Sequence, residues 1–536
     1  MNRIAAVLGL FLFTPISFFA QEQAQEMGLD ERINEWFTPI SNAWQSIVLF
    51  TVPVFGHEIP FVVILLVCGA AFFTVYFSFI NIRRFPLSIN VVRGKYDDLD
   101  HHSADERAQV NIADGDVART IKDESQDGEV SHFQALATAV SGTVGLGNIA
   151  GVALAIALGG PGATFWMIIC GLLGMSTKFV ECTLGVRYRD MDATGKVFGG
   201  PMYYLSKGLK ERGFTGTGKV LAGLFAFLCI GASFGGGNAA QSNQAALQIA
   251  SLLGMDAGNS GTLIGIGLAV VVGIVIIGGI KRIASVTEKV VPFMALIYAM
   301  ACLFIIFSNF SFIDDAFAMI FTEAFSPQAG IGGLAGVLIV GFQRAAFSNE
   351  AGAGSASIAH SAVKTKYPAS EGLVALLEPF IDTVVICTMT ALVIIMYNMG
   401  GHFEYGVGQV VIDGQAVEGA TLTSLAFADS ISWFPYLLTI AIILFAISTM
   451  ISWSYYGLQS WMYLFGRSKT ADLCYKILFL TFIVIGAAAN MSAVWGFSDA
   501  MILALVFPNM IGLFFLFPKV REELGKYLSA IRKKDD

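Results

Sequence analysis

The chain has 536 residues, of which 55% are hydrophobic and 13% are charged, and its formal net charge is −8. A soluble domain carries about 25% charged residues, so this composition excludes an ordinary soluble protein and indicates a polytopic helical membrane protein. Continuous apolar runs of about 20 residues exclude a transmembrane β-barrel, whose strands alternate polar and apolar residues. Basic patches with interleaved aromatics are missing from the sequence, so we expect no nucleic-acid partner.

The N-terminus resembles a secretory signal peptide. Residues 1–20 hold Arg3 and then an apolar run, and the chain turns polar after them. A charged start before a short apolar run is typical of a signal peptide, although Phe18 suits a cleavage site poorly, so a retained signal anchor is the alternative. The acidic residues 21–58 are expected outside the inner membrane, with a surface helix over about 33–50.

Eleven membrane-spanning helices are predicted. The first covers 59–80 and precedes a polar loop, 81–131, in which the acidic tract 97–129 is interpreted as a solvated insertion. The other ten are expected at 132–158, 164–186, 219–250, 261–280, 286–308, 331–354, 373–398, 431–462, 472–490 and 496–517. Lys and Arg gather in alternate loops and in the tail 518–536. Because basic loops stay in the cytoplasm, we expect a bacterial inner-membrane protein with its N-terminus outside and its C-terminus in the cytoplasm.

The ten later spans divide into two sets of five, 132–308 and 331–517, that begin on opposite sides of the membrane. Two odd-numbered halves in opposite orientation form the inverted repeat of many ion-coupled transporters. The predicted fold is therefore all-α and polytopic, an inverted five-plus-five helix repeat with one extra N-terminal transmembrane helix.

The first helix of each set is interrupted near its middle. The run 141–151 holds four glycines together with Ser141, Thr143 and Asn148, and each glycine weakens a helix by about 1 kcal/mol relative to alanine. The run 341–355 in the second set is similarly rich in glycine and polar residues. Unwound backbone at membrane depth is tolerated where it lines a polar cavity. Two discontinuous helices in corresponding positions therefore predict a binding site, with close helix packing as the alternative.

The first break suits a free amino acid. Backbone N–H groups near Gly145, Gly147 and Asn148 are placed to receive a carboxylate, as helix N-termini do. Carbonyls on the other side of the break, with nearby hydroxyls, suit Na⁺ and an ammonium group. The site would thus bind a zwitterion without burying an uncompensated charge.

Two further spans offer polar faces. Gln241 lies on one of them, in the third helix of the first set. On the third helix of the second set, Thr449 and Trp453 share one face, and Ser448 and Ser452 share an adjoining one. Hydroxyl pairs are candidate Na⁺ ligands. The indole of Trp453 is expected to bound the binding site and so limit the size of the substrate side chain. Interhelical hydrogen bonding is the alternative for each.

Charged residues inside membrane-spanning helices are costly to bury, so they are usually paired with another polar group or take part in function. Arg344 and Glu350 flank the second break and are interpreted as ligand or gate residues, or as an internal ion pair. Lys178 is interpreted as paired or snorkelling near the end of its span. Glu378 and Asp382 lie one helical turn apart and indicate a cation or proton relay, or an inward polar network.

Several stretches resemble the alanine or glycine:cation symporters of the amino acid–polyamine–cation superfamily, over about residues 59–520. These stretches are Gly142–Gly151, Gly159–Ala163, Gly174–Lys178, Gly199–Tyr204, Phe347–Ser355 and Trp453–Gly457. The resemblance implies a leucine-transporter-like fold. It also implies Na⁺-coupled, in some members H⁺-coupled, uptake of small neutral amino acids by alternating access.

The resemblance also implies residue roles. The substrate would contact Thr143, Gly145, Gly147, Asn148, Gln241, Phe347, Thr449 and Trp453. The Na⁺ site would use carbonyls near Ser141 and Val144 with the hydroxyls of Ser448 and Thr449. Thr449 is therefore a candidate for both sites.

The sequence thus predicts a symporter that imports alanine or glycine with Na⁺, with H⁺ as the alternative coupling ion and no other cofactor. Its expected partners are the amino acid, Na⁺ and the lipid bilayer. A carrier of another small solute is the nearest alternative. A channel would need a continuous polar pore, and a transporter-derived nutrient sensor would need a folded output domain. An enzyme is not expected, because the sequence shows neither a nucleophile–base pair nor a metal-ligand cluster.

Overall fold

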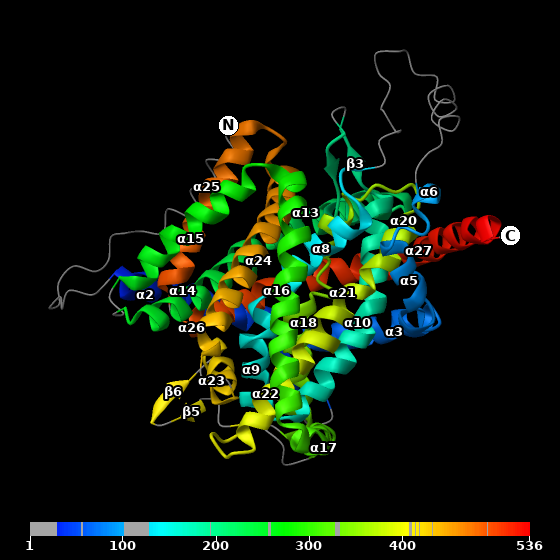
Figure 1. Ribbon diagram of the computed structural model, residues 1–536. Helices are drawn as coiled ribbons and strands as arrows, with labels where there is room; N and C mark the ends of the chain where they lie inside the picture. The colour runs from blue at the N-terminus through cyan, green and yellow to red at the C-terminus, as the bar shows by residue number, and fades with distance from the viewer. Residues whose placement is uncertain are drawn as a thin grey trace, which may run out of the picture.

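The computed structural model describes residues 29–54, 57–100, 128–192, 195–255, 259–326, 333–406, 410–412, 414–417, 419–430, 433–489 and 491–535. The predicted signal peptide lies outside these ranges, as does most of the acidic tract 97–129. Within them the protein is almost wholly helical, and its strands form three two-stranded hairpins (Figure 1).

Long apolar helices make up the body of the protein. Their bounds are α10 Gly162–Arg187, α13 Thr215–Phe234, η3 Gly235–Ala239, α14 Ala240–Leu253, α15 Ser260–Ile276, α16 Gly279–Ser308, α18 Gly333–Asn349, α20 Pro368–Ala375, α21 Leu377–Pro379, η5 Phe380–Cys387, α22 Thr388–Asn398, α24 Phe434–Phe465, α25 Lys469–Ala488, α26 Met491–Ala504 and α27 Val506–Asp535. Among the described residues, seven helices are long and apolar enough to cross a membrane, or eight when a bent pair counts as one span. The polytopic, all-helical fold is confirmed, and the count of eleven spans stays a prediction.

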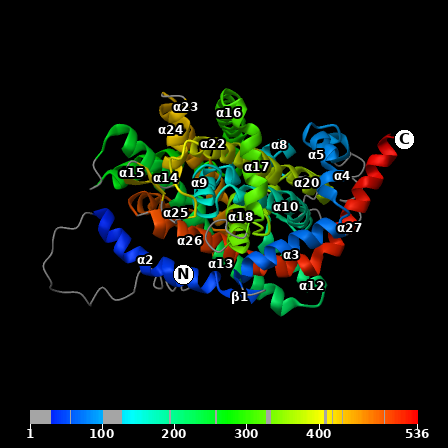
Figure 2. The ribbon, with the colours of Figure 1, turned by 90° about the horizontal axis from the view of Figure 1, so that it is seen from below.

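Further elements, most of them short, pack around this body. They are α2 Leu29–Val48, α3 Phe61–Tyr76, α4 Ile80–Arg83, α5 Phe85–Val92, α6 Asp97–Asp100, α11 Pro201–Tyr203, η2 Tyr204–Gly208, α12 Leu209–Glu211, η4 Phe310–Phe312, α17 Ile313–Ala324 and α23 Ala420–Ser430. The hairpins pair β1 Thr51–Val54 with β2 His57–Pro60, β3 Asp190–Met191 with β4 Val197–Phe198, and β5 Val410–Ile412 with β6 Gln415–Val417. Helix α2 lies along one side of the molecule, packed against α26 (Figure 2).

The helices of the two sets pack against one another in a symmetric pattern. Corresponding helices contact one another: α10 packs on α20, α13 on α24, and α15 on α25. The fifth helix of each set packs on the third helix of the other set. Thus α16 packs on α24, and α26 packs on η3 and α13. A two-fold axis that relates one set to the other produces this pattern, as expected for an inverted repeat.

The first broken helix consists of α8 His132–Thr143, η1 Leu146–Asn148 and α9 Ala150–Gly159, with a bend of 56° between α8 and the continuation. A capping box starts α8, since the Ser131 hydroxyl accepts from the Gln134 N–H and the Gln134 side chain accepts from the Ser131 N–H. Helix α9 ends at Gly160, whose φ of +69° is a left-handed value that glycine adopts without strain.

The second break lies within the predicted run 341–355 and is shorter than that run. Helix α18 continues unbroken from Gly341 to Asn349, and the break is confined to 350–355, before α19 Ala356–His360. Gly341 serves packing instead, because a Cβ there would lie 2.7 Å from the carbonyl oxygen of Ala163 on α10. Positive φ angles at Glu350, Gly352 and Gly354 turn the chain out of the helix.

Candidate functional site

The first break is closed by side chains of the protein itself. Asn148 Oδ1 accepts a hydrogen bond from the Gly145 N–H (2.8 Å), and Gln241 Oε1 accepts one from the Leu146 N–H (3.2 Å). The Gln241 side chain is fixed in turn, because its Nε2 donates to the Gly236 carbonyl of η3 (2.9 Å). Two N–H groups at the break are thus occupied by amide oxygens, which resemble one half of a carboxylate.

The predicted Na⁺ residues meet where α8 crosses α24. Thr449 Oγ1 donates to the Ser141 carbonyl (3.0 Å), and Ser141 Oγ donates to the Ser448 carbonyl (2.8 Å). Ser448 Oγ donates within its own helix to the Phe445 carbonyl (2.9 Å). The cluster consists of neutral oxygens, which are the ligands that hard cations prefer. Val144 follows at the end of α8, where its backbone leaves the helix.

The predicted substrate residues lie on both sides of this cluster. A Cβ on Gly145 would lie 2.5 Å from Thr449 Oγ1 and 3.2 Å from Gln241 Oε1, so these three residues are in direct contact. A Cβ on Gly147 would lie 3.5 Å from the Phe347 ring. The first break therefore faces the last turn of α18, just before the second break, and the missing side chains of the glycines permit the approach.

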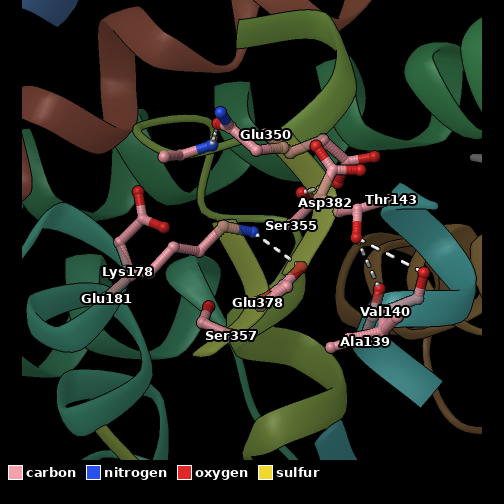
Figure 3. A network of polar contacts seen from close by, with 12 residues as sticks. Ala139, Val140, Thr143, Lys178, Glu181, Glu350, Ser355, Ser357, Glu378 and Asp382 are labelled. Carbon is pink, nitrogen blue, oxygen red and sulfur yellow. Dashed lines mark hydrogen bonds and ion pairs between the residues drawn. The ribbon is translucent and has the colours of Figure 1, made fainter. Parts of the chain in front are cut away.

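The hydroxyl of Thr143, a predicted substrate residue, is bonded within its own helix. It lies 3.3 Å from the Ala139 carbonyl and 3.4 Å from the Val140 carbonyl, both within α8 (Figure 3). A hydroxyl bonded back into its own helix is a common arrangement for a buried threonine.

Trp453 is held by Glu350, which the sequence analysis interpreted as a ligand or gate residue or as part of an ion pair. Its Nε1 donates to Glu350 Oε1 (3.0 Å), and its ring lies against Gly237, where a Cβ would be 2.2 Å from Trp453 Cγ. This contact explains Gly237 of η3, because the indole needs the space that a Cβ there would occupy. Trp453 therefore links α24 to the second break, in addition to any role in limiting the size of the substrate side chain.

Glu350 occupies a strained position. Its φ is +54°, a left-handed value that costs a residue with a Cβ about 1–2 kcal/mol. The residue is 2% exposed, and its carboxylate accepts hydrogen bonds from Trp453 Nε1 and from the Ser355 hydroxyl. Glu350 and Ser355 are drawn in Figure 3. Strain of this kind persists only where surrounding contacts enforce it, and it is concentrated at functional sites.

Arg344 does not pair with Glu350. It forms an ion pair with Asp499 on α26, and its guanidinium lies 5.8 Å from the centre of the Phe347 ring. Phe347 in turn lies against Trp495, with ring centroids 5.0 Å apart. Sequence reasoning missed this pair because Asp499 is 155 positions away, and only the packing of α18 on α26 joins them.

Asp382 joins the two broken helices. Asn148 Nδ2 donates to Asp382 Oδ1 (2.7 Å), and Ser348 Oγ donates to Asp382 Oδ2 (2.8 Å). Thr383 Oγ1 donates to the same Oδ2 atom (2.7 Å). The sequence singled out Asp382 as part of a relay or an inward polar network, but it gave no signal that Asn148 would be its partner.

These features are those of a class of protein, the helical membrane transporters with two discontinuous helices. Residues 42–536 match the sequence model of the sodium:alanine symporter family. The chain belongs to this family, which confirms the resemblance inferred from its motifs.

Individual relatives agree with this assignment. The chain is 38% identical to the sodium/alanine symporter AgcS of Methanococcus maripaludis over 89% of its length and 96% of that protein. It is 37% identical to the probable sodium/glutamine symporter GlnT of Bacillus subtilis, over 74% and 78% of the two chains.

Solved structures resemble it more distantly. One is MhsT in complex with L-phenylalanine, which is 14% identical, with a TM-score of 0.43 over 73% of this chain and 99% of that one. The other is a mutant manganese transporter of Eremococcus coleocola, which is 13% identical, with a TM-score of 0.47 over 78% and 82%.

Proposed function

We propose that the protein imports a small neutral amino acid, alanine or glycine, together with Na⁺ by alternating access. The observation that carries this proposal is the cluster at the first break, where Ser141, Ser448 and Thr449 place neutral oxygens next to Gly145 and Gln241. Such oxygens suit a hard monovalent cation. The adjacent N–H groups suit a carboxylate.

In this proposal, the side-chain oxygen of Gln241 occupies the position of the substrate carboxylate when no substrate is bound. Its Oε1 accepts from the Leu146 N–H, which is the kind of donor that a substrate carboxylate needs. An amino acid would displace this oxygen, and Gln241 would then turn toward the substrate. Thr143, Gly147 and Asn148 would complete the binding site on the broken helix, and Phe347 and Trp453 would bound it from the second set.

Na⁺ would bind before or with the amino acid. The carbonyls of Ser141 and Val144 and the hydroxyls of Ser448 and Thr449 would coordinate it, so that the ion joins α8 to α24. Because α8 and α24 belong to different helix sets, an ion between them favours one relative position of the sets. This is the physical link by which a Na⁺ gradient would drive uptake.

The distribution of Lys and Arg supports an orientation in a bacterial inner membrane with the N-terminus outside and the C-terminus in the cytoplasm. Arg344 with Asp499, and Glu350 with Trp453, connect α18 and the second break to α26 and α24, which all belong to the second set, so we infer that they hold the helices of this set together. H⁺ is retained as the alternative coupling ion.

Glutamine is the second candidate substrate, because one relative of similar identity is named a probable sodium/glutamine symporter. The test is uptake of labelled alanine, glycine, glutamine and leucine into proteoliposomes with and without Na⁺ outside. Na⁺-dependent uptake of alanine or glycine supports the proposal. Uptake of glutamine alone supports the second candidate, and uptake without Na⁺ contradicts both.

A further inference from the structure

Two asparagine side chains, one at each break, accept a hydrogen bond from a backbone N–H group that lies just beyond the end of a helix. Asn148 Oδ1 accepts from the Gly145 N–H (2.8 Å), which follows α8, and Asn349 Oδ1 accepts from the Ala351 N–H (3.0 Å), which follows α18. Both asparagines are at most 1% exposed. Their NH₂ groups therefore need acceptors inside the protein, because a buried donor without a partner is costly.

Both NH₂ groups lead to Asp382 on η5, which is drawn in Figure 3. Asn148 Nδ2 donates to Asp382 Oδ1 (2.7 Å) and to the main-chain carbonyl of the same residue (3.1 Å). Asn349 Nδ2 donates to Thr383 Oγ1 (2.9 Å), and this hydroxyl donates to Asp382 Oδ2 (2.7 Å). A chain of hydrogen bonds thus joins the two breaks, and every hydrogen bond in it points toward Asp382.

The centre of this chain has to be a group that accepts from both sides. A backbone N–H can only donate, so a chain with one at each end needs an acceptor between them, and a carboxylate is such a group whereas a carboxamide has one accepting and one donating end. Asp382 is fully buried, and its contact from the Ser348 hydroxyl is also a donor (2.8 Å). This carboxylate therefore turns the NH₂ group of each asparagine inward and the amide oxygen of each toward its break.

We propose that Asp382 is a positioning residue of the amino-acid site, which holds both asparagine amides in the orientation that fits the two breaks and does not itself touch the substrate. This inference rests on the proposed function, because Gly145 and Asn148 are residues of that site. If the Asn148 amide turned over, its NH₂ group would face the Gly145 N–H, so that two donors would oppose each other and the first break would lose its shape. Only the fraction of the protein with the correct amide orientation then binds the amino acid, and the apparent affinity falls with that fraction.

The test is binding of labelled alanine, glycine and glutamine to the purified full-length protein, at low and at saturating Na⁺. Asp382→Asn keeps the shape of the side chain and replaces one accepting oxygen with a donor. Its NH₂ group faces either the NH₂ group of Asn148 or the Thr383 hydroxyl, which then loses the acceptor of its own proton. We expect the amino-acid affinity to fall about 10- to 100-fold at both Na⁺ concentrations, the ratio that corresponds to one hydrogen bond to a charged group.

A second variant keeps the inference testable if Asp382→Asn fails to fold. Thr383→Val preserves the carboxylate and its contact with Asn148, but it removes the acceptor that orients Asn349. The amino-acid affinity should fall in this variant as well, because the second break then loses its fixed amide.

Thr390→Val is the matched control. Thr390 is fully buried on α22, which continues from η5, and its hydroxyl contacts the Tyr298 hydroxyl of α16 (2.8 Å) rather than a break. This variant should lose stability and bind the amino acid like wild type. Wild-type affinity in Asp382→Asn, or in Thr383→Val where Asp382→Asn does not fold, overturns this inference alone. An equal loss in Thr390→Val also overturns it, as does a loss that disappears at saturating Na⁺, which would assign Asp382 to the ion site. If wild type binds none of the three amino acids, the proposed function is overturned as well.

Discussion

Ser448→Ala separates the ion site from the substrate site. Ser448 Oγ donates its proton to the Phe445 carbonyl (2.9 Å), so its lone pairs are left to face a cation. The neighbouring hydroxyl of Thr449 and the carbonyl of Ser141 lie in the same cluster. Removing the Ser448 hydroxyl should therefore weaken Na⁺ binding first and amino-acid binding only through the ion.

The size of the effect follows from the strength of one polar contact to a charge. Such a contact contributes about 1.5–3 kcal/mol. Since 1.4 kcal/mol corresponds to a factor of ten, the Na⁺ concentration for half-maximal binding should rise about 10- to 100-fold. By linkage, alanine affinity falls at low Na⁺ and recovers when Na⁺ saturates the site.

The assay is alanine binding to purified protein across a Na⁺ titration. Ser454→Ala is the matched control, because Ser454 is also buried on α24 and its hydroxyl also donates to a carbonyl three residues earlier, that of Ile451 (2.6 Å). The control should titrate like wild type. A loss of alanine affinity that persists at saturating Na⁺ would refute the reasoning and place Ser448 in the substrate site or in the packing.

Three further outcomes are expected. Trp453→Phe removes the N–H that bonds to Glu350, so the free energy of unfolding should fall by about 1–3 kcal/mol, and an unchanged thermal midpoint would contradict this. Gly145→Ala places a Cβ 2.5 Å from a hydroxyl of α24 and should abolish alanine binding, whereas Gly223→Ala meets nothing within 4 Å and should bind normally. Equal binding by both glycine variants would remove the first break from the site. Ser103→Cys, in a background without the native cysteines, should resist impermeant thiol reagents on intact spheroplasts, and labelling would reverse the orientation.

Local sequence chemistry predicted the helical architecture and the first break. Glycine, serine and asparagine within an apolar run weaken a helix wherever it lies, so the break at Val144 and Gly145 could be located from composition. The second break occupies only the end of the predicted run 341–355, because Gly341 serves packing and the positive φ angles at Glu350, Gly352 and Gly354 take the chain out of the helix.

Long-range partners could not be predicted from local patterns. Arg344 is near Glu350 in sequence, yet it pairs with Asp499, and Asn148 reaches Asp382 across 234 positions. Each of these partners depends on which helices pack together. The spacing of apolar residues along a single helix does not determine this packing. The sequence interpreted Lys178 as paired or snorkelling, and it is paired and fully buried, but its partner Glu378 lies 200 positions away and could not be named.

The central claim is that a Na⁺ gradient drives accumulation of a small neutral amino acid. The most direct measurement is the alanine concentration inside proteoliposomes under an inward Na⁺ gradient. We predict saturable accumulation above the external concentration, which collapses when an ionophore dissipates the gradient. Equilibration to the external concentration, unaffected by the gradient or the ionophore, would contradict the claim.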